Sequence, residues 1–382
     1  MAPKKVKIGI VGVGGMGLGH CQTVQKIEEI ELAAVADVNP ARAKEVGERF
    51  SVPHFGSHKE LIDAGVAEAV VVATPHYFHP PIAIDAFRAG LHVLSEKPMG
   101  VRIGMAEKMV EAARKSGKVF CVMFQMRTTA AVKKARELVE AGELGDIRRT
   151  LLISPEFRSQ AYYNSGSWRA TWGGEGGGVL LNQAPHIMDV FVMLGGMPSK
   201  VHGRCATLMH DIETEDYAEA MLEYANGASG YFYTSTCEVG ERLVEIVGDK
   251  GALRLTGGTL SFKRFEPPVA EFNRTNTQMW GSPAAKPVDL AIEACESGHQ
   301  VVLRNFARAI LYAEPLVSPG EAGLGSLELA NAIILSSHRK KPVEVPIDRR
   351  AYNSLISRLR AKSKFQDEWT VSKRETDPRL KR

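Results

Sequence analysis

A glycine-rich turn directly after a short apolar run is the feature of this 382-residue chain that most constrains its fold. The run Val6–Val11 is rich in β-branched residues and predicts a buried strand, whereas Leu18–Lys26 is compatible with a helix. Between them lies GVGGMG, residues 12–17, which has the spacing G-x-G-x-x-G. Strand, glycine turn and helix in this order predict a dinucleotide-binding Rossmann fold, a doubly wound parallel sheet.

The glycines of this turn have separate physical tasks. Gly12 permits the tight turn, and Gly14 lets backbone N–H groups approach a pyrophosphate. Gly17 lets the helix pack closely on its strand. We therefore expect the turn, including Gly15, to bind the cofactor phosphates.

An acidic residue, Asp37, ends the next strand-like run, Glu31–Asn39, and lies 20 residues beyond Gly17. A carboxylate at this spacing bonds a ribose 2′-hydroxyl and repels a 2′-phosphate, which favours NAD over NADP. Two alternatives stay open. Asp37 could instead cap the helix that begins near Pro40, and Arg42 could neutralise the extra phosphate of NADP.

Two further apolar runs, Ala69–Thr74 and Leu91–Ser95, predict strands of the same parallel sheet. Ligands of such sheets bind outside the carboxyl ends of the strands. We therefore expect cofactor contacts from the residues at those ends: Thr74, Pro75, His76, His79, Glu96 and Lys97. Lys97 is also a candidate reactive residue, although its position suits an ordinary solvated lysine equally well.

The second half of the chain has the pattern of a different, mostly antiparallel sheet. Six strand-like runs follow Gly195, with turn residues such as Asn226-Gly227 between them. The runs are Val201–Met209, Tyr217–Tyr224, Gly230–Thr236, Leu243–Val247, Ala252–Leu255 and Thr259–Phe265. Helices are expected at Val301–Leu311 and Leu324–Ser337. One face of this sheet is left free, and such a face is usually covered by another subunit.

Charge and cysteine content exclude several classes of protein. The net charge is +4, and residues 351–382 hold nine Lys/Arg against four Asp/Glu, so the rest of the chain is nearly neutral. The tail has no continuous basic block, so no nucleic-acid partner is expected. Five scattered cysteines without a CxxC pair predict reduced core thiols, a cytoplasmic protein and no metal site. No window is apolar enough to span a membrane.

With these motifs in order, the chain resembles the glucose-fructose oxidoreductase and inositol dehydrogenase family (Gfo/Idh/MocA). The resemblance runs from Val6 to about Pro346 and rests on GVGGMG, Asp37, TPHYFH, SEKP and GEGGGVLLNQAPHIMD. It implies an NAD-binding domain over residues 1–125 and a substrate-binding and oligomerisation α/β domain with an open-faced mixed sheet over 126–350. It also implies homodimers or homotetramers formed through the second sheet. Residues 351–382 lie beyond the resemblance, and their charge predicts a basic helix or tail.

The resemblance further implies the roles of individual residues. Met16 belongs to the pyrophosphate loop, and Gln125 flanks the nicotinamide or the substrate. Lys97 matches the catalytic lysine and His186 the substrate-contacting histidine. Asn182 stands where an aspartate is usual, and an amide cannot accept a proton as a carboxylate does.

Residues 182, 186 and 189 would share one face of a helix that begins near Gly178. Pro185 would kink that helix or lie in its first turn. We therefore expect Asn182 and His186 to converge on one substrate, with Asn182 orienting a neutral His186. Asp189 is expected to orient the helix or to pair with a lysine, and a histidine bonded to a backbone carbonyl is the alternative for His186.

The segment 154–178 combines aromatic rings with polar side chains and predicts a substrate loop. Aromatic faces cover the apolar face of a sugar while polar groups bond its hydroxyls. The candidates for substrate binding here are Arg158, Tyr163, Trp168 and Arg169. An ordinary packed Ω-loop is the alternative.

The sequence thus predicts an NAD-dependent oxidoreductase that acts on a hydroxyl or keto carbon of a sugar, cyclitol or sugar derivative. Lys97 would act as the acid–base group with a lowered pKa, and His186 would assist it. Two alternatives are kept. One is an enzyme that retains its NAD and uses transient oxidation to drive elimination, epimerisation or hydrolysis, and the other is a non-catalytic cofactor-binding sensor.

Overall fold

Six parallel strands form the first sheet, in the order β3-β2-β1-β4-β5-β6. The computed structural model describes residues 4–365. The strands are β1 (Val6–Val11), β2 (Ile30–Ala36), β3 (His54–Phe55), β4 (Ala69–Val72), β5 (His92–Ser95) and β6 (Phe120–Val122). This order is that of doubly wound dinucleotide-binding domains, so the predicted fold of the first third is confirmed.

Both faces of this sheet are buried at its centre, where the strands are mostly apolar. In β4, Val70 and Val72 pack against one hydrophobic cluster, and Ala69 and Val71 pack against another. The alternation of buried and exposed positions that marks a half-exposed strand is therefore absent from β4, as expected for a parallel sheet. The helices that follow the strands are α1 (Gly15–Val24), α2 (Pro40–Phe50), α3 (His58–Asp63), α4 (His79–Arg88) and α5 (Ile103–Ser116).

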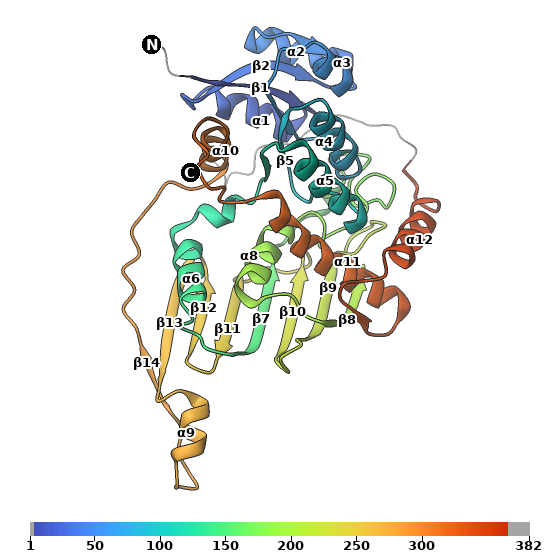
Figure 1. The fold of residues 1–382 in the computed structure, drawn as a ribbon. Coiled ribbons are helices and arrows are strands. Elements are labelled where there is room, and N and C mark those ends of the chain that lie inside the picture. The colour runs from blue at the N-terminus through green and yellow to red at the C-terminus, as the bar shows by residue number, and fades with distance from the viewer. Residues whose placement is uncertain (1–3, 366–382) are drawn as a thin grey trace.

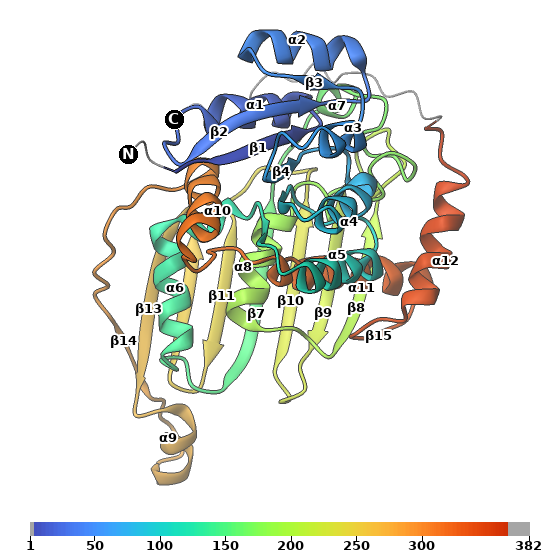
Figure 2. The same ribbon diagram turned by 45° about the horizontal axis from the view of Figure 1, so that its top comes forward.

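A helix from late in the chain completes this domain. Helix α10 (His299–Tyr312) contributes Val302, Leu303 and Phe306 to the cluster that contains β1 and α1. Figures 1 and 2 both show α10 beside α1 and β1. The chain therefore returns to the first sheet after it has formed β7–β14 of the second, and only the short strand β15 follows.

The second sheet has nine strands in the order β14-β13-β12-β11-β7-β10-β9-β8-β15. Only the neighbours β7 and β10 are parallel. The strands are β7 (Ile147–Pro155), β8 (Lys200–Ala206), β9 (Tyr217–Glu223), β10 (Ser229–Ser235), β11 (Leu243–Gly248), β12 (Gly251–Thr256), β13 (Thr259–Glu266), β14 (Ala284–Pro287) and β15 (Val343–Glu344). The predicted mixed, mostly antiparallel sheet is confirmed.

Helices cover one face of this second sheet. Figure 1 shows α6, α8 and α11 in front of the strands, and the strands alternate accordingly. In β10, Phe232 and Thr234 are buried, whereas Tyr231 and Tyr233 on the other face are half-buried. The remaining helices are α6 (Ala130–Glu140), α7 (Gln160–Tyr163), α8 (Pro185–Gly195), α9 (Val269–Thr275), α11 (Gly323–Arg339) and α12 (Arg349–Arg360). Short 3-10 turns lie at η1 (His76–Phe78), η2 (Gln125–Thr128) and η3 (Gly320–Ala322).

Three sequence expectations need comment. All five cysteines are free, but Cys295 is exposed, so the prediction of core thiols is wrong for that residue. The predicted C-terminal helix is α12, and residues 366–382 of the predicted tail lie outside the described residues. Across residues 4–365, no helix is both long and apolar enough to cross a lipid bilayer.

Candidate active site

The glycine turn after β1 has the geometry that a pyrophosphate site needs. Gly12 has a φ of +84°, and a Cβ at Gly17 would lie 1.8 Å from the Gly12 carbonyl oxygen. A Cβ at Gly14, by contrast, would meet nothing within 4 Å. Helix α1 begins at Gly15, earlier than predicted, with Met16 in its first turn and no side chain capping it. The open approach and the uncapped N–H groups fit the phosphates of a dinucleotide.

Asp37 lies beside this turn, directly after β2. Its carboxylate accepts hydrogen bonds from the N–H groups of Val13 and Asn39, both at 2.9 Å. Asn39, and not Asp37, caps helix α2. Arg42 donates to the Val13 carbonyl at 2.8 Å and to both carboxylate oxygens of Glu45 at 2.8 Å, so its charge is already paired. This arrangement fits an unphosphorylated ribose better than a 2′-phosphate.

The residues after β4 form a buried loop that faces the glycine turn. The Thr74 hydroxyl is buried and has no partner among the described residues, and its methyl group would meet a Cβ at Gly12. Pro75 precedes η1. His79 lies between the carbonyls of Pro98, at 2.8 Å, and Thr74, at 2.6 Å. His79 therefore ties the ends of β4 and β5 together, and the Thr74 hydroxyl is the group in this loop that a cofactor would bond.

His76 in the same loop also has a structural contact. Its Nδ1 lies 3.0 Å from the backbone carbonyl of Glu175. Burial, with the charges of His79 and Lys97, holds the pKa of His76 well below its ordinary value, so the ring is neutral. His76 thus links the first domain to the loop that precedes α8.

Glu96, at the end of β5, is a buried carboxylate held by a histidine. His20 Nε2 of α1 lies 2.7 Å from Glu96 Oε1, and the backbone N–H of Lys97 donates to Glu96 Oε2 at 3.2 Å. Burial opposes the charge of Glu96. The hydrogen bond to His20 and the electrostatic interactions with His20, His299 and Lys97 together outweigh burial and lower the pKa of Glu96. Glu96 therefore stays ionised and holds the backbone N–H of Lys97 in place.

Lys97 reaches across to the loop that precedes α8. Its Nζ donates to the backbone carbonyl of Asn182 at 2.8 Å. The side chain of Asn182 bonds elsewhere: its Nδ2 donates to Glu175, and its Oδ1 accepts from the Tyr162 hydroxyl at 3.3 Å. The expectation that Asn182 orients His186 is therefore wrong, because the amide faces Glu175 and Tyr162.

The reason lies in the local backbone. Residues 178–184 form turns, and α8 begins only at Pro185, its first position, where a missing N–H costs nothing. The predicted helix from Gly178 is thus wrong, whereas the placement of Pro185 in a first turn is confirmed. Asn182 lies outside the helix and is not on a face with His186 and Asp189.

His186, in the first turn of α8, pairs with Gln125 instead. The Nε2 atoms of the two side chains lie 3.2 Å apart. His186 Nδ1 and Gln125 Oε1 are buried and without a partner in the described part of the chain. Burial and the charge of Lys97 hold the pKa of His186 well below its ordinary value, so the ring is neutral as predicted. The two unpartnered atoms are the polar groups that a ligand beside Lys97 would satisfy.

Asp189 is occupied by an arginine and not by a lysine. Its two carboxylate oxygens accept from Arg127 Nε and Nη2, both at 2.7 Å. This bidentate pair joins α8 to η2. It therefore holds His186 and Gln125 opposite each other.

In the predicted substrate loop, Tyr163 and its neighbour Tyr162 have different surroundings. The Tyr163 hydroxyl bonds Thr236 at 2.7 Å, and its buried ring packs on His210. Tyr162 faces the site: its hydroxyl bonds Asn182 and accepts from Gln183 Nε2 at 3.2 Å. Neighbouring residues of the short helix α7 point in different directions, so sequence alone did not separate the two.

Two arginines flank Tyr162. Arg169 donates to the Tyr162 hydroxyl at 2.7 Å, and its guanidinium stacks over the rings of Tyr162 and Trp168. Arg158 also lies over Tyr162 and pairs with Glu156. Arg158, Trp168 and Arg169 are therefore gathered around Tyr162, which borders Asn182.

The sequence reasoning missed four polar residues of this region: Tyr162, Glu175, Gln183 and Glu215. Glu215 is buried and accepts from the N–H groups of Gly178 and Leu180. A charged residue inside the glycine run GGEGGG is the one feature of the sequence that could have drawn attention to Glu175.

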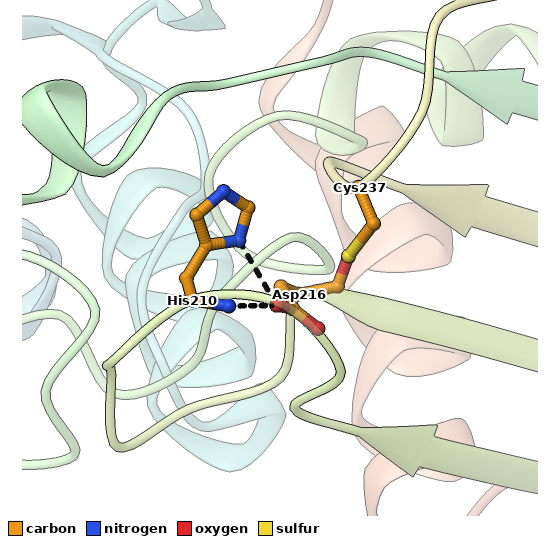
Figure 3. Close-up of side chains that lie close together, drawn as sticks. All are labelled: His210, Asp216 and Cys237. Atoms are coloured by element: carbon orange, nitrogen blue, oxygen red, sulfur yellow. Dashed lines mark hydrogen bonds and ion pairs between the residues drawn. The ribbon is translucent and has the colours of Figure 1, made fainter.

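A cluster of His210, Asp216 and Cys237 (Figure 3) has the residue types of a metal site. The His210 ring packs against Tyr163. The polar atoms of the cluster are already bonded. Asp216 accepts from the N–H groups of Leu208, Met209 and His210 and lies 2.9 Å from His210 Nδ1. His210 Nε2 lies 2.8 Å from the Arg158 carbonyl. Burial raises the pKa of Cys237 to about 11, so its sulfur is a thiol. Through His210, the cluster contacts the Arg158 carbonyl and the Tyr163 ring.

The open glycine turn of a Rossmann sheet, with a lysine just past the end of β5 and a neutral histidine in the first turn of α8, has the features of a nicotinamide-dependent oxidoreductase. The chain belongs to the Gfo/Idh/MocA oxidoreductase family. Residues 6–124 match the oxidoreductase family with an NAD-binding Rossmann fold, and residues 132–254 match the GFO/IDH/MocA C-terminal domain.

Named relatives share this organisation. The chain is 24% identical over 348 residues to myo-inositol 2-dehydrogenase of Thermotoga maritima, covering 89% of this chain and 98% of the relative. It is 31% identical over 268 residues to trans-1,2-dihydrobenzene-1,2-diol dehydrogenase of Bos taurus, covering 65% and 76%. The crystal structure of the WlbA dehydrogenase of Bordetella pertussis with NADH and UDP-GlcNAcA is similar with a TM-score of 0.76 and 28% identity, covering 90% of this chain and all of the other.

Proposed function

We propose that this protein transfers a hydride between NAD and a hydroxyl or keto carbon of a sugar, cyclitol or sugar derivative. The observation that carries the proposal is the position of Lys97 at the carboxyl end of β5, where its Nζ bonds the Asn182 carbonyl. That carbonyl lies four residues before His186, which pairs with Gln125 and whose pKa is lowered by burial and the charge of Lys97. The relatives named above act on a cyclitol or a cyclic diol, and WlbA binds a nucleotide-linked sugar acid, which supports this class of substrate.

NAD, when bound, supplies the carbon that accepts or returns the hydride. The glycine turn would hold its pyrophosphate, and Asp37 would bond a ribose. Thr74, with its unpartnered hydroxyl, would add a further polar contact. The pairing of Arg42 with Glu45 supports NAD over NADP, because no free guanidinium of Arg42 is left for a 2′-phosphate.

Lys97 would take the proton of the substrate hydroxyl during oxidation and return it during reduction. Lys97 must lose its own proton first. Nearby negative charges hinder this deprotonation, whereas burial of the ammonium favours it. His186 would stay neutral and bond the same substrate oxygen or its neighbour through Nδ1. Gln125 fixes the His186 ring from the other side.

The aromatic loop would bind the rest of the substrate. Tyr162, Trp168 and Arg169 form a stacked group that offers aromatic faces and hydrogen-bond donors. Polyhydroxylated rings need both kinds of contact. Tyr163 would support this loop from behind.

We also propose how the chain divides this work. Residues 1–125 would bind NAD, residues 126–350 would bind substrate and form the oligomer, and residues 351–382 would form a basic appendage. The half-buried tyrosines on the uncovered face of the second sheet suit contact with a second copy. Light scattering that finds a monomer across micromolar concentrations would contradict the oligomer.

The test of the function is turnover by the purified protein. NAD and a panel of sugars, cyclitols and sugar acids are mixed with protein, and the absorbance of reduced nicotinamide is followed. We expect reduction of NAD with at least one member. Lys97→Ala should abolish turnover and leave NAD affinity within a few fold, while Lys59→Ala, at an exposed lysine, should change neither.

Other results would point elsewhere. Comparable kcat in Lys97→Ala would refute its assigned role. Conversion of a sugar without net NAD reduction, by protein that retains NAD through purification, would show the enzyme that uses transient oxidation. NAD binding without any turnover or product would show a sensor.

A further inference from the structure

A buried carboxylate, Glu175, lies inside the loop that precedes α8 and has no part in the function proposed above. Its side chain is among the least accessible in the protein, with 1% relative exposure of the residue. One carboxylate oxygen accepts from the backbone N–H of Ala170 at 2.7 Å, and the other accepts from Asn182 Nδ2. Burying a carboxyl group is costly, and these two hydrogen bonds offset part of that cost.

The partner on one side of Glu175 has an unusual backbone. Ala170 has a φ of +49°, which is uncommon for a residue with a Cβ. Its carbonyl accepts from the N–H groups of Glu213 and Thr214, so both sides of Ala170 are held. Such conformations persist only where the surroundings fix them, and they gather at functional sites.

The partner on the other side of Glu175 leads to Lys97. Asn182 is held at its side chain by Glu175 and Tyr162 and at its N–H by the Gly178 carbonyl, at 2.9 Å. Its own backbone carbonyl accepts from Lys97 Nζ at 2.8 Å. Glu175 thus sets the position of the oxygen that binds the lysine.

Charged and polar groups from several neighbouring segments affect the pKa of Glu175. Burial raises the pKa of Glu175 and outweighs the opposing effects of the Arg169 charge, the Ala170 N–H, the Asn182 amide and the Lys97 charge. The neutral ring of His76 bonds its backbone carbonyl. Besides burial, the electrostatic interaction with Glu175 raises the pKa values of Tyr163 and Glu215. Since the attraction between Glu175 and Lys97 is mutual, an ionised Glu175 favours the ammonium form of Lys97.

We infer that Glu175 is a positioning residue for proton transfer at Lys97, because its carboxylate holds Asn182 and its charge acts on the lysine that Asn182 binds. Asn182 brings an amide without charge, so an ionised Glu175 would add a negative charge near Lys97 besides that of Glu96. The inference rests on the proposed role of Lys97 as the acid–base group.

The first test neutralises this charge at constant shape. Glu175→Gln should lower kcat by about tenfold and leave the KM for NAD unchanged. The alkaline-rising limb of kcat/KM for oxidation should move to lower pH by roughly half a unit or more, because loss of a neighbouring negative charge makes Lys97 easier to deprotonate. A purely structural role would lower stability or kcat without moving this limb.

The decisive variant exchanges the two partners. Glu175→Gln with Asn182→Asp keeps both side-chain shapes, one amide-to-carboxylate hydrogen bond and one negative charge. We expect it to return the limb to within about 0.2 pH units of the unmodified enzyme, and kcat to within about threefold, because the charge stays beside Lys97. Glu215→Gln is the matched control: Glu215 is also buried and holds the same loop, through Gly178 and Leu180. It should leave the limb in place.

The outcomes separate the two proposals. A limb unmoved by Glu175→Gln, or an exchanged variant no better than Glu175→Gln alone, would overturn the inference. Full turnover in Lys97→Ala would instead overturn the proposed function. If Glu175→Gln fails to fold, Asn182→Asp replaces it as the probe: its added charge should move the limb to higher pH, and an unmoved limb would contradict the inference.

Discussion

At the scale of single residues, two glycines of the same turn serve different ends. A Cβ at Gly17 would fall 1.8 Å from the Gly12 carbonyl oxygen, whereas a Cβ at Gly14 would enter open space. The fold therefore requires a glycine at position 17. At position 14, a glycine is required only by the ligand that binds there. Variants can separate these two demands.

We predict that Gly17→Ala lowers the melting temperature by several degrees, since the turn and α1 must move apart. Gly14→Ala should keep the melting temperature within about a degree and weaken NAD binding at least tenfold, because the methyl group would occupy the space of the pyrophosphate. Thermal unfolding and calorimetric titration measure the two effects. Equal loss of stability in both variants would contradict this division.

Asp37 allows a second prediction. NAD should bind more tightly than NADP, because the carboxylate faces the ribose and Arg42 is paired with Glu45. Asp37→Ser should narrow the difference, since it removes the repulsion of a 2′-phosphate. It should also loosen the turn slightly, because Asp37 accepts from Val13. Tenfold tighter binding of NADP to the unmodified protein, measured by calorimetry, would refute the preference.

Motifs made of local spacing could be read from the sequence. The glycine turn, Asp37, Lys97 and His186 all stand where the spacing and the resemblance implied, at strand ends or in the first turn of α8. Tyr162 could not be separated from Tyr163 in this way, because both lie in the four-residue helix α7. Only the folded structure shows that Tyr163 packs on His210 whereas Tyr162 bonds Asn182.

At the scale of elements, buried polar side chains made one strand hard to predict from the sequence. Strand β7, at the centre of the second sheet, was not predicted. Its inward positions are Thr150, Leu152 and Ser154, so two of three are polar, and the alternation expected of a half-buried strand is reversed. The Thr150 hydroxyl is satisfied by Tyr224 at 2.9 Å, a contact that only the folded sheet provides.

At the start of α8, by contrast, the sequence pattern predicted helix where the structure has turns. The spacing of 182, 186 and 189 suited a helix, but Glu215 holds the N–H groups of Gly178 and Leu180 in turns. Those N–H groups are satisfied by a side chain 35 or more residues away, which no local pattern shows. Long-range capture of backbone donors is thus the physical reason that Asn182 was misplaced.

The joint between α8 and η2 supports a third prediction. Arg127 and Asp189 form a buried bidentate pair that holds His186 opposite Gln125. Asp189→Asn should lower the free energy of unfolding by about 3 kcal/mol, because it leaves a buried guanidinium unpaired. Arg127→Met with Asp189→Leu should recover most of this stability but not the full kcat, since apolar side chains do not fix the angle between α8 and η2. Urea unfolding and steady-state kinetics test both parts, and a neutral single variant would contradict the claim.

At the scale of the whole molecule, the candidate site belongs to no single layer. The first sheet supplies the glycine turn and Lys97, and the loop before α8 supplies Asn182, which meets Lys97 across the two parts of the chain. His76 and Glu175 form a second contact between the same parts. Activity therefore depends on how the two sheets are held together, and buried carboxyls near this junction make that arrangement sensitive to pH.

Two adjacent carboxyls there titrate in opposite ways. Burial raises the pKa of Glu215 to about 7. Burial acts in the same sense on Asp216, but the N–H donors of Leu208, Met209 and His210 outweigh it and lower its pKa. Asp216 therefore adds stability above its ordinary pKa of about 3.9, and that stability is lost as the pH falls through its lower folded value.

Glu215 gives the last prediction, with the opposite sign. The folded state prefers its neutral form, so its contribution to stability is present below the ordinary pKa of about 4.3 and is lost as the pH rises to about 7. Glu215→Gln is always neutral and should not undergo this loss. Relative to the unmodified protein, the variant should therefore gain up to roughly 3 kcal/mol of unfolding free energy between about pH 4.5 and pH 7, and no more above that range. Asp216→Asn is the matched comparison, whose deficit at neutral pH should shrink as the pH falls. Denaturant unfolding of all three proteins across this range measures the differences, and curves for Glu215→Gln and the unmodified protein that run parallel would show that Glu215 is already ionised when folded.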